Sequence, residues 1–287
     1  MSAPSPSPFE GLLQKGDLLQ ALALLHQELQ ASEPDPGRLL MIFSLEVRLH
    51  RFADAQATLR HVIELAPQAA AGLASYARCA RAEEARLARL TSPEVAGQRA
   101  ALLPPPPHLL SYSTAAVQHA QGHHAVAAAA LEQANAQRPR VSGTFTWTSG
   151  RTQRFVDLLD MDALTGAVLP CFGGDALLDL PYCQLRSVTF MRGPSSFDAL
   201  WVPAEIVLVD GQLVHVRVPA LYVGTGVAEF ASARMGQSTL FFHDKGYCVG
   251  LGQRDLELHG EGGERTMVGI LAAAKIDFDA PASLEPS

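Results

Sequence analysis

HAQGHHAVAAAALEQANAQRP, residues 119–139, decides how the first part of this chain folds. Gly122 separates two runs of helix-forming residues, Ala127 follows within the second run, and Pro139 closes that run. Glycine permits the left-handed backbone of a tight turn, alanine lets two helices cross closely, and proline cannot continue a helix. The stretch therefore predicts two antiparallel helices joined at Gly122.

The same arrangement occurs twice earlier in the chain. Ala21 stands five residues after Gly16, and Ala55 stands five residues after His50. Ala21 and Ala55 are 34 residues apart, which is the period of tetratricopeptide repeats. Ala127 lies 72 residues beyond Ala55, four more than two periods, and the aromatic positions of the repeat are mostly missing. The pattern predicts a degenerate tetratricopeptide-like domain of helical repeats.

Apolar residues in this part recur at helical spacing. Phe52, Leu59 and Val62, for example, fall on one stripe of a helix. The joints between the segments are short, which favours antiparallel neighbours, and the PPPP stretch at 104–107 predicts a stiff extended linker. The expected helices are 9–15, 17–31, 38–50, 52–65, 69–90, 108–121 and 123–137.

Three histidines in the opening stretch raise the question of a metal site. His119 and His123 are four residues apart, a spacing that would place both on one face of a continuous helix. The turn at Gly122 interrupts that geometry, and the chain has neither an H-E-x-x-H motif nor paired cysteines. We therefore expect no metal here and interpret these residues as exposed histidines at a helix–helix corner.

The composition changes near residue 140. Of the 23 glycines, 17 lie in 141–287, as do both tryptophans and the whole net charge of −7. Glycine-rich, short apolar runs are typical of strands and turns, whereas the alanine-rich runs before them favour helices. The sequence predicts an α+β protein: a disordered lead at 1–8, an all-α repeat domain at 9–140, a β-rich domain at 141–280 and a tail at 281–287.

The second part is expected to form a small, partly closed antiparallel sheet. Asp210-Gly211 lies between two apolar runs and predicts a tight hairpin turn, and GEGGE at 260–264 separates a second pair of strands. The expected strands are 167–172, 176–180, 187–190, 205–210 and 213–219, followed by a pair at 246–258 and 266–271.

Charge and composition exclude several classes of protein. An acidic chain argues against a nucleic-acid partner, and the absence of a run of about 18 apolar residues argues against a membrane span. The N-terminal MSAPSPSPFE does not resemble a secretory signal. Four isolated cysteines are typical of reduced, packed thiols. They are Cys79, Cys171, Cys183 and Cys248. We expect a cytoplasmic protein.

Catalytic motifs are missing from the second part. Asp160 and Asp162 lack the glycine and glutamate that close a calcium loop, so we interpret them as a solvated turn. GLGQRD at 250–255 has no helix after it, so its glycines indicate a bulge rather than a dinucleotide loop. Arg254 is expected to pair with a nearby carboxylate, and Trp201 to anchor the core. We expect no cofactor and no catalytic residues.

Several stretches of the second part carry a family resemblance. They are the DxDxLTG residues Asp160, Asp162, Leu164, Thr165 and Gly166, then LRSVTF (185–190), LWVPAEI (200–206), VPALYVGT (218–225) and GLGQRDL (250–256). Together they resemble the ImpE family, also called TagJ or SciE, of accessory proteins in bacterial type VI secretion. The resemblance implies a non-enzymatic adaptor that binds the N-terminal helix of the small contractile-sheath subunit. It also implies an influence on sheath assembly, or on recycling by the associated unfoldase.

Three hypotheses follow, of which the third is a regulatory scaffold that has no peptide groove and works through oligomerisation. The other two each name a site. In the first, the helical repeats form a groove for a partner helix, and repeat geometry places Leu40, Ser44, Val47 and Arg48 on its inner face. In the second, the β-rich domain binds a small molecule or acts as an enzyme, and four polar residues converge in one pocket. Those four residues are Asp160, Asp162, His215 and Arg254.

Overall fold

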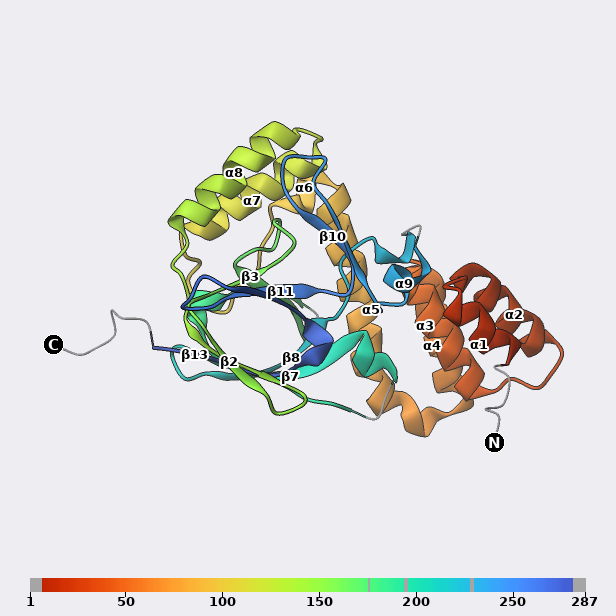
Figure 1. Cartoon of the computed structure of the whole chain (residues 1–287). Helices are drawn as coiled ribbons and strands as arrows, with labels where there is room; N and C mark the ends of the chain where they lie inside the picture. The colour runs from red at the N-terminus through yellow and green to blue at the C-terminus, as the bar shows by residue number, and fades with distance from the viewer. Residues whose placement is uncertain (1–6, 175, 194–195, 228–229, 281–287) are drawn as a thin grey trace.

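The computed structural model describes residues 7–174, 176–193, 196–227 and 230–280, and the helices come first along the chain (Figure 1). They are α1 (Pro8–Gln14), α2 (Leu18–Gln30), α3 (Pro36–Arg48), α4 (Phe52–Leu65), α5 (Ala70–Thr91), α6 (Pro93–Ala96), α7 (His108–Ala120), α8 (His124–Gln137) and, within the β-rich part, α9 (Ala231–Arg234). The seven expected helices are confirmed to within a few residues, and the short α6 and α9 were not predicted. Of the lead expected at 1–8, residues 1–6 lie outside the described residues, as does the tail at 281–287, whereas Ser7 and Pro8 cap and begin α1, so the lead ends earlier than predicted.

The predicted hairpin turns are confirmed by the backbone. Each hairpin reverses at a residue with positive φ, and the alanine five positions later is fully buried where the helices cross. The turns are Gly16, His50 and Gly122, with φ of 63°, 58° and 78°, and the alanines are Ala21, Ala55 and Ala127. A non-glycine residue therefore holds the left-handed conformation in the second hairpin.

The three hairpins do not form one continuous stack. Helices α1–α4 lie together at one end of the molecule, and the α7–α8 hairpin covers the β-rich part elsewhere (Figure 1). Tyr112, Ala127 and Leu131 of that hairpin pack against Leu164 and Tyr247 of the β-rich part. The 22-residue α5 separates the two groups, which explains why the third hairpin is out of phase in the sequence.

Antiparallel strands make up the second part. They are β1 (Gly143–Trp147), β2 (Thr152–Phe155), β3 (Asp157–Asp160), β4 (Val168–Gly173), β5 (Ala176–Pro181), β6 (Leu185–Phe190), β7 (Trp201–Leu208), β8 (Leu213–Pro219), β9 (Thr239–Phe242), β10 (Val249–Gly252), β11 (Asp255–His259), β12 (Arg265–Gly269) and β13 (Ala273–Phe278). One sheet has the order β2-β1-β13-β6-β7-β8-β4-β5, a second has the order β12-β11-β3, and β10 pairs with β9.

Most expected strands are present, with one correction. The β7–β8 hairpin turns at Gly211, whose φ is 89°, and β11–β12 form the second expected pair. The single run expected at 246–258 is instead two strands, because Gly252 has a φ of 106° and breaks the extended backbone. A side chain at Gly252 would also collide with the carbonyl of Ser238, so this position requires glycine.

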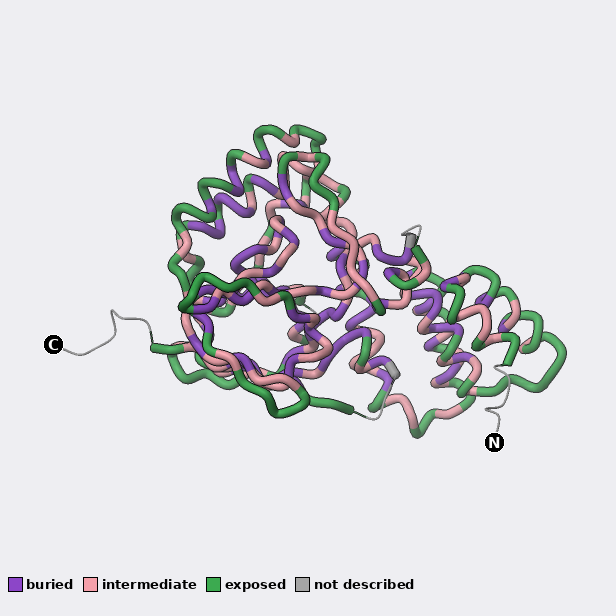
Figure 2. Tube along the Cα trace, in the orientation of Figure 1, coloured by how far each residue is buried: buried purple, intermediate pink, exposed green. Residues whose placement is uncertain are grey.

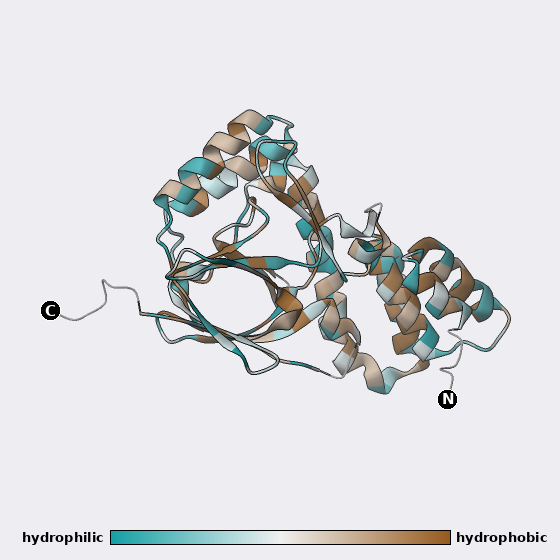
Figure 3. Cartoon of the chain, in the orientation of Figure 1, coloured by the Kyte–Doolittle hydropathy of each residue, from teal (hydrophilic) through white to brown (hydrophobic). Residues whose placement is uncertain are grey.

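The two larger sheets enclose one apolar core. Phe145, Val188 and Ile206 of the eight-stranded sheet meet Leu158 and Leu256 of the three-stranded sheet, and all five are fully buried. Buried stretches line the ring of strands and the facing sides of the helices (Figure 2). Apolar and polar residues alternate around α1–α4 (Figure 3), as expected for amphipathic helices that share a core.

A second core joins the helices to the sheet. Trp201 of β7 is 1% exposed, with its ring centroid 6.3 Å from those of Phe43 in α3 and Tyr76 in α5. Its indole N–H donates a hydrogen bond of 3.0 Å to Glu83 Oε1. The expectation that Trp201 anchors the core is confirmed. None of the described helices is long and apolar enough to cross a membrane.

Candidate functional site

Asp160 and Arg254 form a buried ion pair at the centre of the β-rich part. Asp160 ends β3, and Arg254 stands between β10 and β11, next to the β11 strand that pairs with β3. Both side chains are at most 2% exposed, and Arg254 Nη1 contacts Asp160 Oδ2. The expected carboxylate partner of Arg254 is therefore confirmed.

Further hydrogen bonds complete the surroundings of the Asp160 carboxylate. Its Oδ1 accepts from the Tyr222 hydroxyl at 2.9 Å and from the Asp162 amide at 2.8 Å. The Tyr222 ring lies 5.3 Å from the guanidinium carbon of Arg254, and a side chain at Gly250 would collide with that ring. These contacts compensate for the cost of burying both charges.

Asp162 is also buried, so the interpretation of these aspartates as a solvated turn was wrong. Its Oδ1 accepts from the Leu164 amide at 2.9 Å, and its Oδ2 accepts from the Gly250 amide at 3.1 Å. Burial, together with the nearby charge of Asp160, raises the pKa of Asp162 to about 6. The carboxylate therefore closes its own turn and ties it to β10.

Replacing Asp162 with Asn should change how stability depends on pH. A carboxyl group whose pKa is higher in the folded than in the unfolded protein takes up a proton on folding. The contribution of Asp162 to the free energy of unfolding of the wild type therefore increases as the pH falls from 7.5 to 5. The D162N variant lacks this gain. We expect the stability of the wild type relative to D162N to rise by about 1 kcal/mol over this range. Urea unfolding at both pH values measures it, and an unchanged difference would contradict the assignment.

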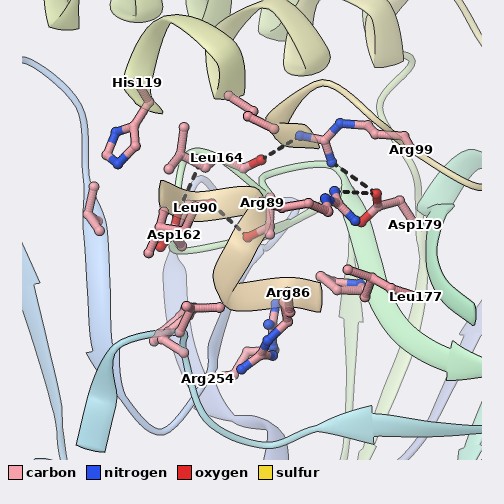
Figure 4. A pocket seen from close by; sticks show the side chains of 17 residues that line it. Arg86, Arg89, Leu90, Arg99, His119, Asp162, Leu164, Leu177, Asp179 and Arg254 are labelled. Carbon is pink, nitrogen blue, oxygen red and sulfur yellow. Dashed lines mark hydrogen bonds and ion pairs between the residues drawn. The ribbon is translucent and has the colours of Figure 1, made fainter. Parts of the chain in front are cut away.

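A partly open cavity of about 90 Å³ lies beside this cluster, between α5, α7 and the strands (Figure 4). Its charged lining consists of the guanidinium groups of Arg86, Arg89, Arg99 and Arg254 and the carboxylates of Asp162 and Asp179. Leu90 and Leu164 contribute to its apolar walls. The lining therefore has more cationic than anionic side chains. Two of these cations have carboxylate partners just outside it, since Arg254 pairs with Asp160 and Arg86 pairs with Glu83.

Two of the arginines share one carboxylate. Arg89 of α5 contacts Asp179 Oδ2 at 2.6 Å, and Arg99 contacts the same oxygen at 3.3 Å (Figure 4). Arg99 also donates to the carbonyls of Tyr112 and Leu164, at 3.2 and 3.3 Å. The network joins α5, α7, β5 and the loop that follows β3.

His215 lies outside this network, and His119 lies at its margin. His215 is exposed on β8 and lines a different hollow, so it does not join Asp160, Asp162 and Arg254. His119 lines the cavity, is half-buried, and lies 2.5 Å from the Tyr247 hydroxyl through its Nδ1. Burial lowers the pKa of His119 to about 4.

The corner histidines are therefore not all exposed as expected. His124 Nδ1 lies 3.2 Å from the same Tyr247 hydroxyl, and only His123 of the three is fully exposed. The β9–β10 segment carrying Tyr247 packs on the α7–α8 corner and covers the other two. Within the described residues, no group of three or more His, Cys, Asp or Glu side chains could hold a metal ion.

Three of the four groove candidates from the sequence line one hollow. Leu40, Ser44 and Arg48 border a hollow of about 490 Å³ between α1, α3 and the Met235 region. Val47 is 5% exposed and packs in the core, so its placement on the accessible face was wrong. It points inward because the stretch that follows β8, including Leu221 and Thr225, covers that side of α3.

Most of the groove surface is apolar. Phe9 and Leu13 of α1, Met41 and Leu45 of α3, Phe197 and Met235 complete its lining. Arg48 is its one described cation; it donates to the Arg234 carbonyl at 3.3 Å, and burial lowers its pKa to about 10, so it is charged at neutral pH. The hollow is an apolar groove with a single positive end.

Comparison with known proteins identifies the family. A family model described as ImpE protein matches residues 152–270, from β2 to the end of β12. The type VI secretion system accessory component TagJ of Pseudomonas aeruginosa is 30% identical over 251 residues, which cover 84% of this chain and 83% of that protein. This chain belongs to the ImpE family. The crystal structure of protein VPA1032 from Vibrio parahaemolyticus shares the ImpE-family fold seen here, with a TM-score of 0.82, 20% identity, and coverage of 97% and 100% of the two chains.

The motifs that carried the ImpE resemblance meet in space. Asp160 and Asp162 belong to the DxDxLTG stretch, and Gly250 and Arg254 belong to GLGQRDL, so the two stretches are joined by the buried cluster. In this ImpE-family protein, both motifs build the cluster rather than an exposed catalytic centre. Sequence reasoning missed Arg86, Arg89, Arg99 and Asp179. Arg86 and Arg89 lie on the alanine-rich α5 and look like part of a solvated face, and Arg99 and Asp179 belong to no recognisable motif.

Proposed function

We propose that this ImpE-family protein is a non-enzymatic accessory component of a type VI secretion system that acts in the cytoplasm. It binds the N-terminal helix of the small contractile-sheath subunit and modulates sheath assembly or its recycling by the associated unfoldase. The observation that carries the proposal is the apolar groove between α1 and α3, which is open to a partner. The similarity to the accessory component TagJ supports the secretion context.

The chemistry of the groove suits an amphipathic helix. Such a helix inserts apolar side chains at i, i+3, i+4 and i+7 into a hydrophobic surface. Met41, which is 40% exposed, and Met235 can adapt to different side chains because methionine is flexible. Arg48 at one end would pair with a carboxylate of the partner and set its direction in the groove.

The satisfied carboxylates support a non-enzymatic role. The oxygens of Asp160 and Asp162 accept hydrogen bonds from protein amides and a tyrosine hydroxyl, and Asp160 pairs with an arginine, so both carboxylates serve to hold strands and turns together. His215, the remaining base of the enzyme hypothesis, lies elsewhere.

Replacing Leu40 with Asp should abolish binding of the partner helix. The substitution places a charge in the apolar floor of the groove and should weaken binding at least about tenfold, because burying an unpaired carboxylate costs more than 1.4 kcal/mol. Fluorescence anisotropy of a labelled peptide, the N-terminal helix of the small sheath subunit from the same operon, measures the affinity of the full chain.

Leu19→Asp is the matched control. Leu19 is 54% exposed on α2 and is not part of the groove lining, so this variant should bind like the wild type. Circular dichroism checks that both variants are folded. If the wild type does not bind the peptide, or if L40D binds as well as L19D, the groove is not the site.

A further inference from the structure

The arginine-lined cavity has a charge pattern that the adaptor role does not use. Arg86, Arg89, Arg99 and Arg254 face it, whereas Asp162 and Asp179 are the carboxylates in its lining. Asp179 serves two of these arginines, so the pair Arg89 and Arg99 has one positive charge more than its partner carboxylate.

Arg86 is paired with Glu83 but leaves buried N–H donors without an acceptor. Its side chain is 8% exposed, and its Nη2 donates to the Leu221 carbonyl at 2.8 Å. Its Nε lies 3.0 Å from Glu83 Oε2 without hydrogen-bond geometry, and among the described residues Nη1 has no acceptor at all. A buried guanidinium N–H without an acceptor destabilises the folded protein, because it loses its hydrogen bond to water and gains none in return.

Neighbouring positive charges add to this cost. Arg86 and Arg254 lie close together below α5 in Figure 4. The positive charge of each guanidinium disfavours the charged form of the other. The Nε of Arg99 is likewise buried without an acceptor in the part of the chain that the structure describes. An anion in the cavity would satisfy these donors and offset the repulsion.

We propose that this cavity binds a small organic anion whose charged group is a phosphate or a carboxylate. Guanidinium groups present paired N–H donors that match the oxygens of both groups. The apolar walls formed by Leu90, Leu164 and Leu177 suit an organic body attached to the charged group. The site lies where α5 meets the β-rich part, so its occupant contacts both halves of the chain.

A second hollow gives access from the surface. It is lined by Ala85, Ala88, Val95, Gln98 and Ala100, and it shares Arg89, Arg99 and Leu177 with the cavity. The shared arginines therefore stand between the cavity and the outside, where they would meet an arriving anion first. Arg89, with 16% of its side chain exposed, is the more accessible of the two.

Calorimetric titration of the full chain with phenyl phosphate, benzoate and benzyl alcohol tests the site. We expect saturable binding of at least one anion and none of the neutral alcohol, and the anion that binds more tightly identifies the charged group. Arg86→Gln should weaken that binding at least tenfold. Arg81→Gln, an exposed position on the same helix, should leave it unchanged.

Three results would overturn the proposal. They are no saturable binding of either anion to the wild type, binding of benzyl alcohol as tight as that of the anions, and equal weakening by R81Q and R86Q. If circular dichroism shows that R86Q is not folded, Arg89→Gln takes its place, because the partly exposed side chain of Arg89 tolerates replacement better. Retained affinity in R89Q would then count against the site.

Discussion

Replacing Arg254 with Met should destabilise the protein by about 3–5 kcal/mol, because the change leaves the Asp160 carboxylate buried without its cationic partner. The Tyr222 hydroxyl and the Asp162 amide still donate to Asp160 Oδ1, but neither carries a positive charge. Urea unfolding of the purified variant, followed by circular dichroism, measures the loss. A loss of this size approaches the whole stability of many domains.

Two further variants test whether the loss in R254M comes from the isolated buried charge. The double variant D160N/R254M has no isolated buried charge, so it should be more stable than R254M alone. Arg154→Met breaks an exposed pair with Asp279, whose side chains are 51% and 42% exposed, and should leave the unfolding midpoint nearly unchanged. If R254M unfolds at the same urea concentration as R154M, the buried pair does not stabilise the fold.

Replacing Trp201 with Ala should cost a similar amount, about 3–5 kcal/mol, by opening a large cavity in the core shared by α3, α5 and β7. The same change removes the hydrogen bond to Glu83 and leaves that carboxylate short of a donor. Thermal unfolding followed by circular dichroism at a helix-sensitive wavelength measures the effect.

Trp147→Ala is the matched control, because Trp147 is the only other tryptophan of the chain. It is half-buried, with its ring against Phe145 and under the guanidinium of Arg151, so its loss should cost about 1–2 kcal/mol. Equal losses in the two variants would mean that the joint core between helices and sheet contributes no more than a surface cluster.

Local patterns were sufficient to predict most of the fold. Gly16, Gly122 and their following alanines specify hairpins through backbone freedom and close helix contact, which depend on neighbouring residues only. Strand β13 escaped prediction because both of its partners, β1 and β6, are distant in the chain: Gly143 of β1 pairs with Phe278. Its apolar face makes sense only once the sheet is assembled.

The site was predictable only in part. Three of the four groove candidates share one hollow, because helix phase fixes which residues face one side of α3. Helix phase does not indicate which other elements pack against α3, and the β-rich part covers Val47. Burial of Asp160 and the gathering of arginines around Asp179 depend on the same long-range contacts, so the residue types alone could not indicate them.

Helix α5 belongs to both halves of the molecule at once. Its first turns contribute Leu73 and Cys79 to the core with α2–α4, and its later turns carry Arg86 and Arg89 to the wall of the cavity. A gene fusion or recombination that exchanged one half for another would leave this helix mismatched on one of its sides. The two halves are therefore expected to be inherited together as a single evolutionary unit, rather than to be shuffled into new domain combinations.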